Sequence, residues 1–270
     1  MFGGYLRRLG CRLRPYENAK GSTDAVVEKS LKILEEAFGG KRSKEGALEE
    51  TVALFEAVET TFREKPKAAI FGDLYARDNP RINQDLIHFI EENGWEVITT
   101  PYSAYLKMIA PTYLRKWWVE GHYWDALFSK ALIAGLRLQE RAYYRYFNRI
   151  LDEPEPVYDD PPAKILSEYG IRIENTGESM DNILKIHYIK KHHPEVALFV
   201  QTSPAFCCPA LVTEAMAWKI EKKTGVPIVS ITYDGTGGIK NDAILPYLKY
   251  PRTFPIRDGS GLNLKLPDFA

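Results

Sequence analysis

Four short apolar runs constrain the fold of this chain more than any other feature. Each is five or six residues long, contains β-branched or aromatic residues, and has Gly or Pro close to its ends, as is typical of buried strands. Helical patterns separate them, and strand–helix–strand units pair their strands in parallel through a right-handed crossover. We therefore predict a doubly wound parallel α/β sheet with strands at residues 68–72, 95–100, 197–201 and 227–232.

The predicted helices divide the chain into two regions. Residues 1–64 hold a basic segment and two amphipathic helices, and residues 65–270 form the α/β domain. A helical insertion interrupts this domain at about residues 102–151, with breaks expected near Pro111 and Gly121. An acidic, proline-rich loop follows it. The predicted helices cover residues 25–38, 43–58, 80–93, 180–191, 209–224 and 239–248, and the loop covers residues 152–162.

The helical insertion is rich in Trp and Tyr. Aromatic residues at helical spacing are usually core, so we expect the insertion to cap the sheet. It also holds more aromatic side chains than a thin helical layer can bury. The alternative interpretation is therefore an interface with another subunit, or the wall of a ligand pocket.

Composition argues against several classes of function. Lys+Arg and Asp+Glu each number 36, so the formal net charge is zero, which argues against a nucleic-acid partner. No uncharged apolar run is long enough to cross a membrane, and the N-terminus lacks the apolar region of a secretory signal. We expect a cytoplasmic protein with reduced thiols and no membrane partner. The abrupt N-terminal sequence also leads us to expect one piece of a larger polypeptide or complex.

Residues 202–209 are the strongest candidate for chemistry. They follow a predicted strand and precede a predicted helix, which places them at the carboxyl edge of a parallel sheet, where ligands bind. We predict Pro209 as the first helical residue and Cys208 as the cap. That position favours the thiolate, the form that ligates metals.

The candidate metal ligands are the three cysteines of the chain, Cys207, Cys208 and Cys11. We expect only one of the adjacent pair to bind, and Cys11, in the basic N-terminal segment, is the weaker candidate. A reactive thiol or a purely structural pair is the alternative. An odd number of cysteines excludes a complete disulfide framework.

Three further polar segments are candidates for binding a substrate or a partner. One follows the first strand, one begins the helix at 180–191, and one is a glycine-rich loop whose backbone amides could cradle a phosphate. That loop lacks the lysine of an ATP-binding motif, and no ATP site is predicted. Turns and helix caps are the alternative for all three, and no catalytic residue is assigned. The candidates are Arg77, Asp78, Asn79, Glu178, Ser179, Asp234, Gly235, Thr236, Gly237 and Gly238.

Four segments resemble the 2-hydroxyacyl-CoA dehydratase superfamily. They are residues 70–79, 83–94, 206–216 and 225–235. The Phe-Cys-Cys-Pro sequence at 206–209 and the Tyr-Asp-Gly-Thr sequence at 233–236 are the more specific parts. Over about residues 5–252, the chain is similar to the carboxy-terminal, dehydratase-like part of large CoA-substrate-specific enzyme activase proteins.

The resemblance implies a flavodoxin-like form of the sheet and an iron–sulfur cofactor. Members of the superfamily bind a [4Fe–4S] or double-cubane cluster through cysteines that face a cleft between two such domains. An ATP-hydrolysing activase delivers low-potential electrons to that cluster. The cysteine before Pro209 matches the last ligand position of the superfamily. This sequence lacks both the ATPase motifs of the activase and the first α/β domain, which supplies other cluster cysteines.

The resemblance therefore implies an iron–sulfur-associated component of an anaerobic dehydratase/activase-like system. Its expected role is electron transfer to or from a low-potential [4Fe–4S] centre shared with another subunit or domain. Two alternatives stay open. One is a cluster-free scaffold that binds another subunit through the aromatic helices, and the other is an acyl-CoA-binding protein that uses the loop at 235–238.

Overall fold

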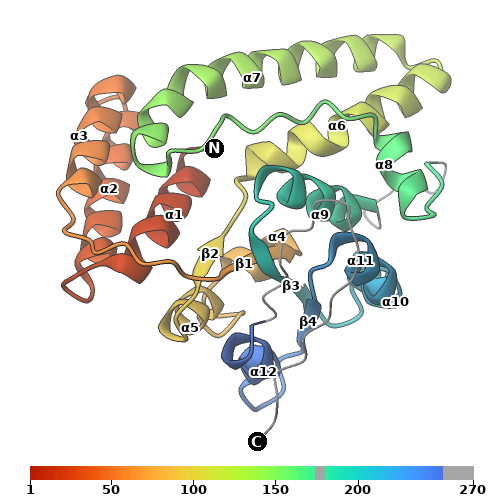
Figure 1. Cartoon of the computed structure of the whole chain (residues 1–270). Helices are drawn as coiled ribbons and strands as arrows, with labels where there is room; N and C mark the ends of the chain where they lie inside the picture. The colour runs from red at the N-terminus through yellow and green to blue at the C-terminus, as the bar shows by residue number, and fades with distance from the viewer. Residues whose placement is uncertain (174–179, 252–270) are drawn as a thin grey trace, which may run out of the picture.

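The computed structural model describes residues 1–173 and 180–251 and is built on a parallel sheet (Figure 1). The sheet has four strands in the order β2-β1-β3-β4, and every neighbouring pair is parallel. The strands are β1 (Lys67–Gly72), β2 (Glu96–Ile98), β3 (Val196–Pro204) and β4 (Ile228–Tyr233). The four predicted strands and their parallel pairing are confirmed.

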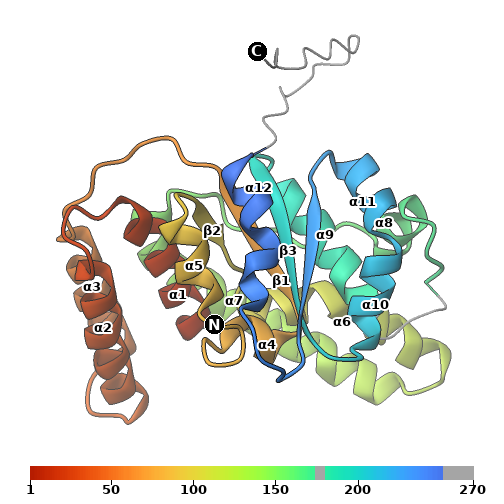
Figure 2. The same ribbon diagram turned by 90° about the horizontal axis from the view of Figure 1, so that it is seen from below.

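Helices cover both faces of the sheet, as a doubly wound topology requires (Figure 2). Successive side chains of a strand point to opposite faces, so Ala69 and Phe71 join one hydrophobic core and Ala68 and Ile70 join the other. The predicted α/β fold class is therefore confirmed. The first core includes α6 (Tyr102–Val119), α8 (Pro162–Glu168), α9 (Asp181–His192) and α11 (Ala217–Thr224), and the second includes α1 (Phe2–Leu13), α5 (Leu86–Glu92) and α12 (Leu245–Lys249).

Buried ion pairs and hydrogen bonds join the basic N-terminal segment to the α/β domain. It forms α1, which the sequence did not lead us to predict, and a 3-10 turn (Arg14–Tyr16). The guanidinium groups of Arg8 and Arg12 and the hydroxyl of Tyr16 donate to the carboxylate of Glu96 over 3.0–3.4 Å. Glu96 belongs to β2 and is completely buried. The positive charge of α1 is therefore balanced inside the protein.

Two N-terminal helices were predicted, and α2 (Ser22–Phe38) and α3 (Lys44–Glu56) confirm them. Their apolar faces form a third core with α1 and the second half of α7 (Tyr123–Leu151). Helix α1 contributes both to this core and to the core of the sheet. It therefore joins the N-terminal helices to the α/β domain.

The aromatic-rich insertion forms a hairpin of two long helices, α6 and α7. The predicted break near Gly121 is confirmed, but the predicted break near Pro111 is wrong, because α6 continues through that residue. A proline removes one backbone hydrogen bond from a helix. The preceding turn is held by a buried ion pair between Lys107 and Glu140 of α7, 2.6 Å apart. Helix α6 caps the sheet as expected, whereas the first half of α7 is largely exposed.

Several helix boundaries differ from the prediction. The helix expected at 80–93 begins only at Leu86, because Gln84 and Asp85 before it adopt positive φ angles of 52° and 55°. A short helix, α4 (Leu74–Asp78), lies where a polar loop was expected. The helix expected at 209–224 is two helices, α10 (Cys208–Ala215) and α11, and the last one is a 3-10 turn (Lys240–Ile244) followed by α12. Helix α9 and the irregular linker at 152–161 confirm the prediction. None of the described helices is long and apolar enough to span a bilayer.

Gly72, the last residue of β1, permits the close approach of β1 and β3. Its φ is +117°, and a Cβ atom there would lie 2.2 Å from the carbonyl oxygen of Thr202. We expect Gly72→Ala to lower the free energy of unfolding by about 2–4 kcal/mol, because it adds backbone strain and a steric clash. Urea denaturation measures this. Gly237→Ala, whose Cβ would meet open space, should cost less than about 0.5 kcal/mol, and equal losses in both variants would contradict this role.

Candidate functional site

The carboxyl edge of the sheet holds a pocket at the point where the strand order reverses. The chain passes from β1 to β2 on one side and from β3 to β4 on the other, so β1 and β3 flank the switch point, where doubly wound folds bind ligands. A pocket of about 140 Å³ lies there. We call it the switch-point pocket. Its lining residues are Gly72, Asp73, Leu74, Tyr105, Asp181, Asn182, Lys185, Cys207 and Pro209.

Lys185 of α9 provides the positive charge of the switch-point pocket. Its side chain is only 4% exposed, and its ammonium donates to the carbonyl oxygen of Gly72 at 2.8 Å and to Asn182 Oδ1 at 3.4 Å. The ammonium also lies 5.1 Å from the ring centre of Tyr105. Burial and the nearby guanidinium of Arg77 lower the pKa of Lys185 to about 8. Both the charged and the neutral amine are therefore accessible near neutral pH.

A polar network fixes α9 beside the pocket. The Tyr105 hydroxyl donates to Asp181 Oδ2 at 2.8 Å. The side-chain amide of Asn182 donates to Thr213 Oγ1 at 3.1 Å, which ties α9 to α10. Asp181, Asn182 and Lys185 are all buried and lie within about one helical turn of α9. The sequence singled out the start of this helix, with Asp181 and Asn182, as a candidate segment but did not single out Lys185, although polar residues on the buried side of a helix are a signal of a site.

The structure separates the three cysteines. Cys207 is the cap residue of α10 and lines the switch-point pocket, whereas Cys208 is the first helical residue and is exposed. The predicted cap position is therefore wrong by one residue, because the helix already begins at Cys208 with Pro209 in its first turn. Phe206, just before them, has a positive φ of 61° and is 91% exposed.

Cys11 lies away from this pocket. It is completely buried in the core that packs against the other face of the sheet, and burial raises the pKa of its thiol to about 12. Within residues 1–173 and 180–251, no group of three or more His, Cys, Asp or Glu side chains is arranged to hold a metal ion. A [4Fe–4S] cluster held by three thiolates of this chain therefore does not fit the described residues. The switch-point pocket offers one cysteine, Cys207.

Arg77 and Asp78 brace the edge of the sheet beside the site. Arg77 is only 1% exposed, pairs with Asp78 at 2.7 Å and donates to Thr100 Oγ1 at 3.2 Å. Asp78 also pairs with Arg7 of α1 at 2.8 Å. Both line a second cavity of about 300 Å³ next to α1 and α2. Asn79 accepts a hydrogen bond from the backbone of Arg81, as in an ordinary Asx turn.

The glycine-rich loop is closed by its own side chains. Asp234 accepts hydrogen bonds from the backbone and the hydroxyl of Thr236 and pairs with Lys240 at 3.0 Å. These donors hold the pKa of Asp234 well below its usual range. A phosphate at Gly235, Gly237 and Gly238 would meet the charge of this carboxylate, so the turn interpretation fits better. Glu178 and Ser179 lie outside the described residues.

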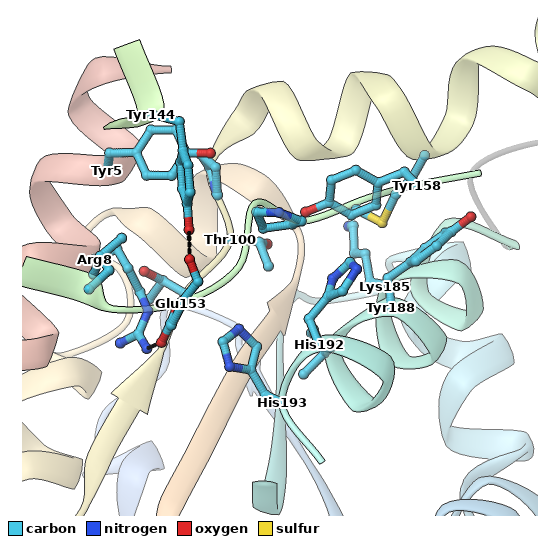
Figure 3. A pocket seen from close by; sticks show the side chains of 16 residues that line it. Tyr5, Arg8, Thr100, Tyr144, Glu153, Tyr158, Lys185, Tyr188, His192 and His193 are labelled. Atoms are coloured by element: carbon cyan, nitrogen blue, oxygen red, sulfur yellow. Dashed lines mark hydrogen bonds and ion pairs between the residues drawn. The ribbon is translucent and has the colours of Figure 1, made fainter. Parts of the chain in front are cut away.

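A narrow cavity of about 30 Å³ continues from the other side of Lys185 (Figure 3). Figure 3 shows Lys185 near Tyr158 and Tyr188 at one end, and Arg8 and Glu153 at the other. The Tyr144 hydroxyl donates to the carbonyl oxygen of Glu153 at 2.9 Å across it. The cavity has room for about one water molecule. It therefore extends the polar surroundings of Lys185 without offering a second substrate site.

Comparison of the chain with protein-family models, with curated proteins and with solved structures finds no match. The geometry of the switch-point pocket and the resemblance of the four sequence segments are therefore the basis for a functional proposal.

Proposed function

We propose that this chain is a substrate-binding component of a 2-hydroxyacyl-CoA dehydratase-like system. The switch-point pocket holds the acyl group of a CoA thioester, and Lys185 donates a hydrogen bond to its carbonyl oxygen. One observation carries this proposal: a buried lysine ammonium lines a pocket at the strand-order reversal of a doubly wound sheet. The substrate class comes from the sequence resemblance.

The volume of the pocket suits a small acyl group. A cavity of about 150 Å³ holds a benzene-sized molecule, and the switch-point pocket measures about 140 Å³. The lactoyl thioester head, with about six non-hydrogen atoms, is comparable in size. The nucleotide part of CoA is far larger, so it lies outside the pocket in this proposal.

The polar groups of the pocket match the two oxygens of a 2-hydroxyacyl group. A lysine ammonium has three N–H donors, of which two point to Gly72 and Asn182. The third N–H group of Lys185 can donate to the carbonyl oxygen of the ligand. Asp181 lines the same pocket, and a carboxylate can accept several hydrogen bonds, including one from the 2-hydroxyl group.

The preference for the acyl ligand should depend on pH through Lys185. The pKa of this group is lowered to about 8, so the ammonium form is present below pH 8 and is lost as the pH rises through that value. We expect the ratio of lactoyl-CoA affinity to free-CoA affinity to fall above about pH 8, because the neutral amine is a weaker donor. Calorimetric titrations from pH 6 to 10 measure this. In Lys185→Met the ratio should stay flat, and a flat ratio in the unmodified chain would contradict the assignment.

A second candidate role rests on Cys207. It caps α10 and lines the pocket, so it is placed to give one thiolate to an iron–sulfur cluster whose other ligands belong to another chain. The test is anaerobic purification of the native complex, with iron and sulfide analysis and EPR. A shared cluster predicts a signal that is lost in Cys207→Ser and kept in Cys208→Ser. A complex without iron, or equal signals in both variants, contradicts this role.

A further inference from the structure

Helix α7 carries an exposed apolar face that the switch-point pocket does not use. At about 100° per residue, Trp124, Phe128, Ala131, Gly135 and Leu138 fall within about 80° of one another on one side of the helix. Ala126, on the opposite side, is buried. We call the side with these five residues the outer face of α7. In Figure 1 this part of α7 runs along the edge of the molecule, beyond α6.

The outer face of α7 reverses the usual pattern of a surface helix, in which apolar residues face the protein. Trp124, Phe128 and Leu138 are 73%, 70% and 72% exposed. Leu127 and Leu132 beside them are more than half exposed as well, and a Cβ at Gly135 would meet open space. Exposed apolar patches of this kind mark interaction surfaces.

We propose that the outer face of α7 packs against the outer face of a second copy of this chain. The two helices run antiparallel, and the two-fold axis passes near Ala131. The five residues follow one another at intervals of four, three, four and three positions. This alternation is the repeat of a coiled-coil seam, so the occupant of the face is another helix with a matching seam.

The order of large and small residues makes the face complementary to itself. In an antiparallel pair, residues that lie equally far from Ala131 on its two sides meet across the interface. Phe128 then meets Ala134 of the second copy, and Leu127 meets Gly135, so these two large side chains each face a small one. Trp124 meets Leu138 at either end. A parallel pair would place Gly135 against Gly135 and leave a cavity.

The exposed apolar area extends from the outer face of α7 to the adjoining turn of the hairpin. Five large side chains on or beside the outer face are more than half exposed, and at roughly 100 Å² each they offer about 500 Å² per chain. Three more at the turn bring the total to about 800 Å², the area that one partner in a standard protein interface buries. The five are Trp124, Leu127, Phe128, Leu132 and Leu138, and the three are Trp118, Val119 and Tyr123.

Sedimentation equilibrium of the full chain tests this proposal. We expect a dimer at micromolar concentration and a loss of association of about 100-fold in Phe128→Glu, which places a charge within the seam. Trp218→Glu is the matched control, because Trp218 is 72% exposed on α11, and it should leave the dimer intact. A monomeric chain, a dimer unaffected by Phe128→Glu, or association with anionic vesicles in place of self-association would overturn the proposal.

Cysteine cross-linking tests the antiparallel order. In a Cys207→Ser, Cys208→Ser background, Trp124→Cys and Leu138→Cys are placed on separate chains and the chains are mixed. Oxidation should join the two variants to each other and join neither variant to itself. Self-linking of Trp124→Cys would show a parallel pair and overturn the geometry.

Discussion

Lys185→Met should weaken the binding of lactoyl-CoA by about 10- to 100-fold and leave the binding of free CoA unchanged. A hydrogen bond from a charged donor contributes about 1.5–3 kcal/mol, and each 1.4 kcal/mol is a factor of about ten in affinity. Methionine keeps much of the length of the side chain but cannot donate to the carbonyl oxygen. Isothermal titration with the two ligands measures the difference.

Two controls make this result specific to the pocket. Lys191→Met removes a lysine from the same helix that is 38% exposed and pairs with Asp160 on the surface, so it should bind lactoyl-CoA as the unmodified chain does. Urea denaturation should show Lys185→Met folded, because it removes a buried charge whose pKa burial lowers. A folded Lys185→Met chain with unchanged lactoyl-CoA affinity would remove Lys185 from the site.

Glu96→Ala should lower the free energy of unfolding by about 3–5 kcal/mol, the usual cost of breaking a buried ion pair. Glu96 is completely buried and accepts hydrogen bonds from Arg8, Arg12 and Tyr16. Its removal leaves the guanidinium of Arg8, which is only 4% exposed, without its main partner in β2. Because these contacts hold α1 against the sheet, the whole domain should still unfold in one transition, but at a lower temperature or urea concentration.

A surface carboxylate provides the comparison for Glu96. Glu49 pairs with Arg149 at 2.6 Å, and both side chains are more than 40% exposed. Glu49→Ala should change the free energy of unfolding by less than about 1 kcal/mol, because exposed ion pairs contribute little. If Glu96→Ala were no more destabilising than Glu49→Ala, the view of α1 as an integral part of the domain would be wrong.

Local sequence was enough to predict the sheet, because each strand is a short apolar run between Gly or Pro residues. It was not enough for features that depend on distant partners. The break expected at Pro111 does not occur, since Lys107 in the turn before it pairs with Glu140 on another helix. Helix α1 was missed because its arginines mark the segment only as locally basic, and the tertiary structure alone places Glu96 between them.

The sequence predicted where the site lies but not which residues line it. The cysteine loop does lie at the carboxyl edge of β3, and Cys207 lines the pocket there. Whether Cys11 joins Cys207 at the pocket could not be judged from the spacing of the cysteines in the sequence, because the answer depends on which face of the sheet α1 covers. Lys185 was missed because an amphipathic helix does not reveal which polar residues turn inward until its neighbours are known.

A crystal structure of the chain with lactoyl-CoA tests the central claim most directly. The proposal predicts the acyl carbonyl oxygen within hydrogen-bond distance of Lys185 Nζ, between Gly72 and Cys207, with the nucleotide outside the pocket. An acyl group bound in the cavity beside Arg7 and Asp78, or no acyl group bound at saturating ligand, would contradict it.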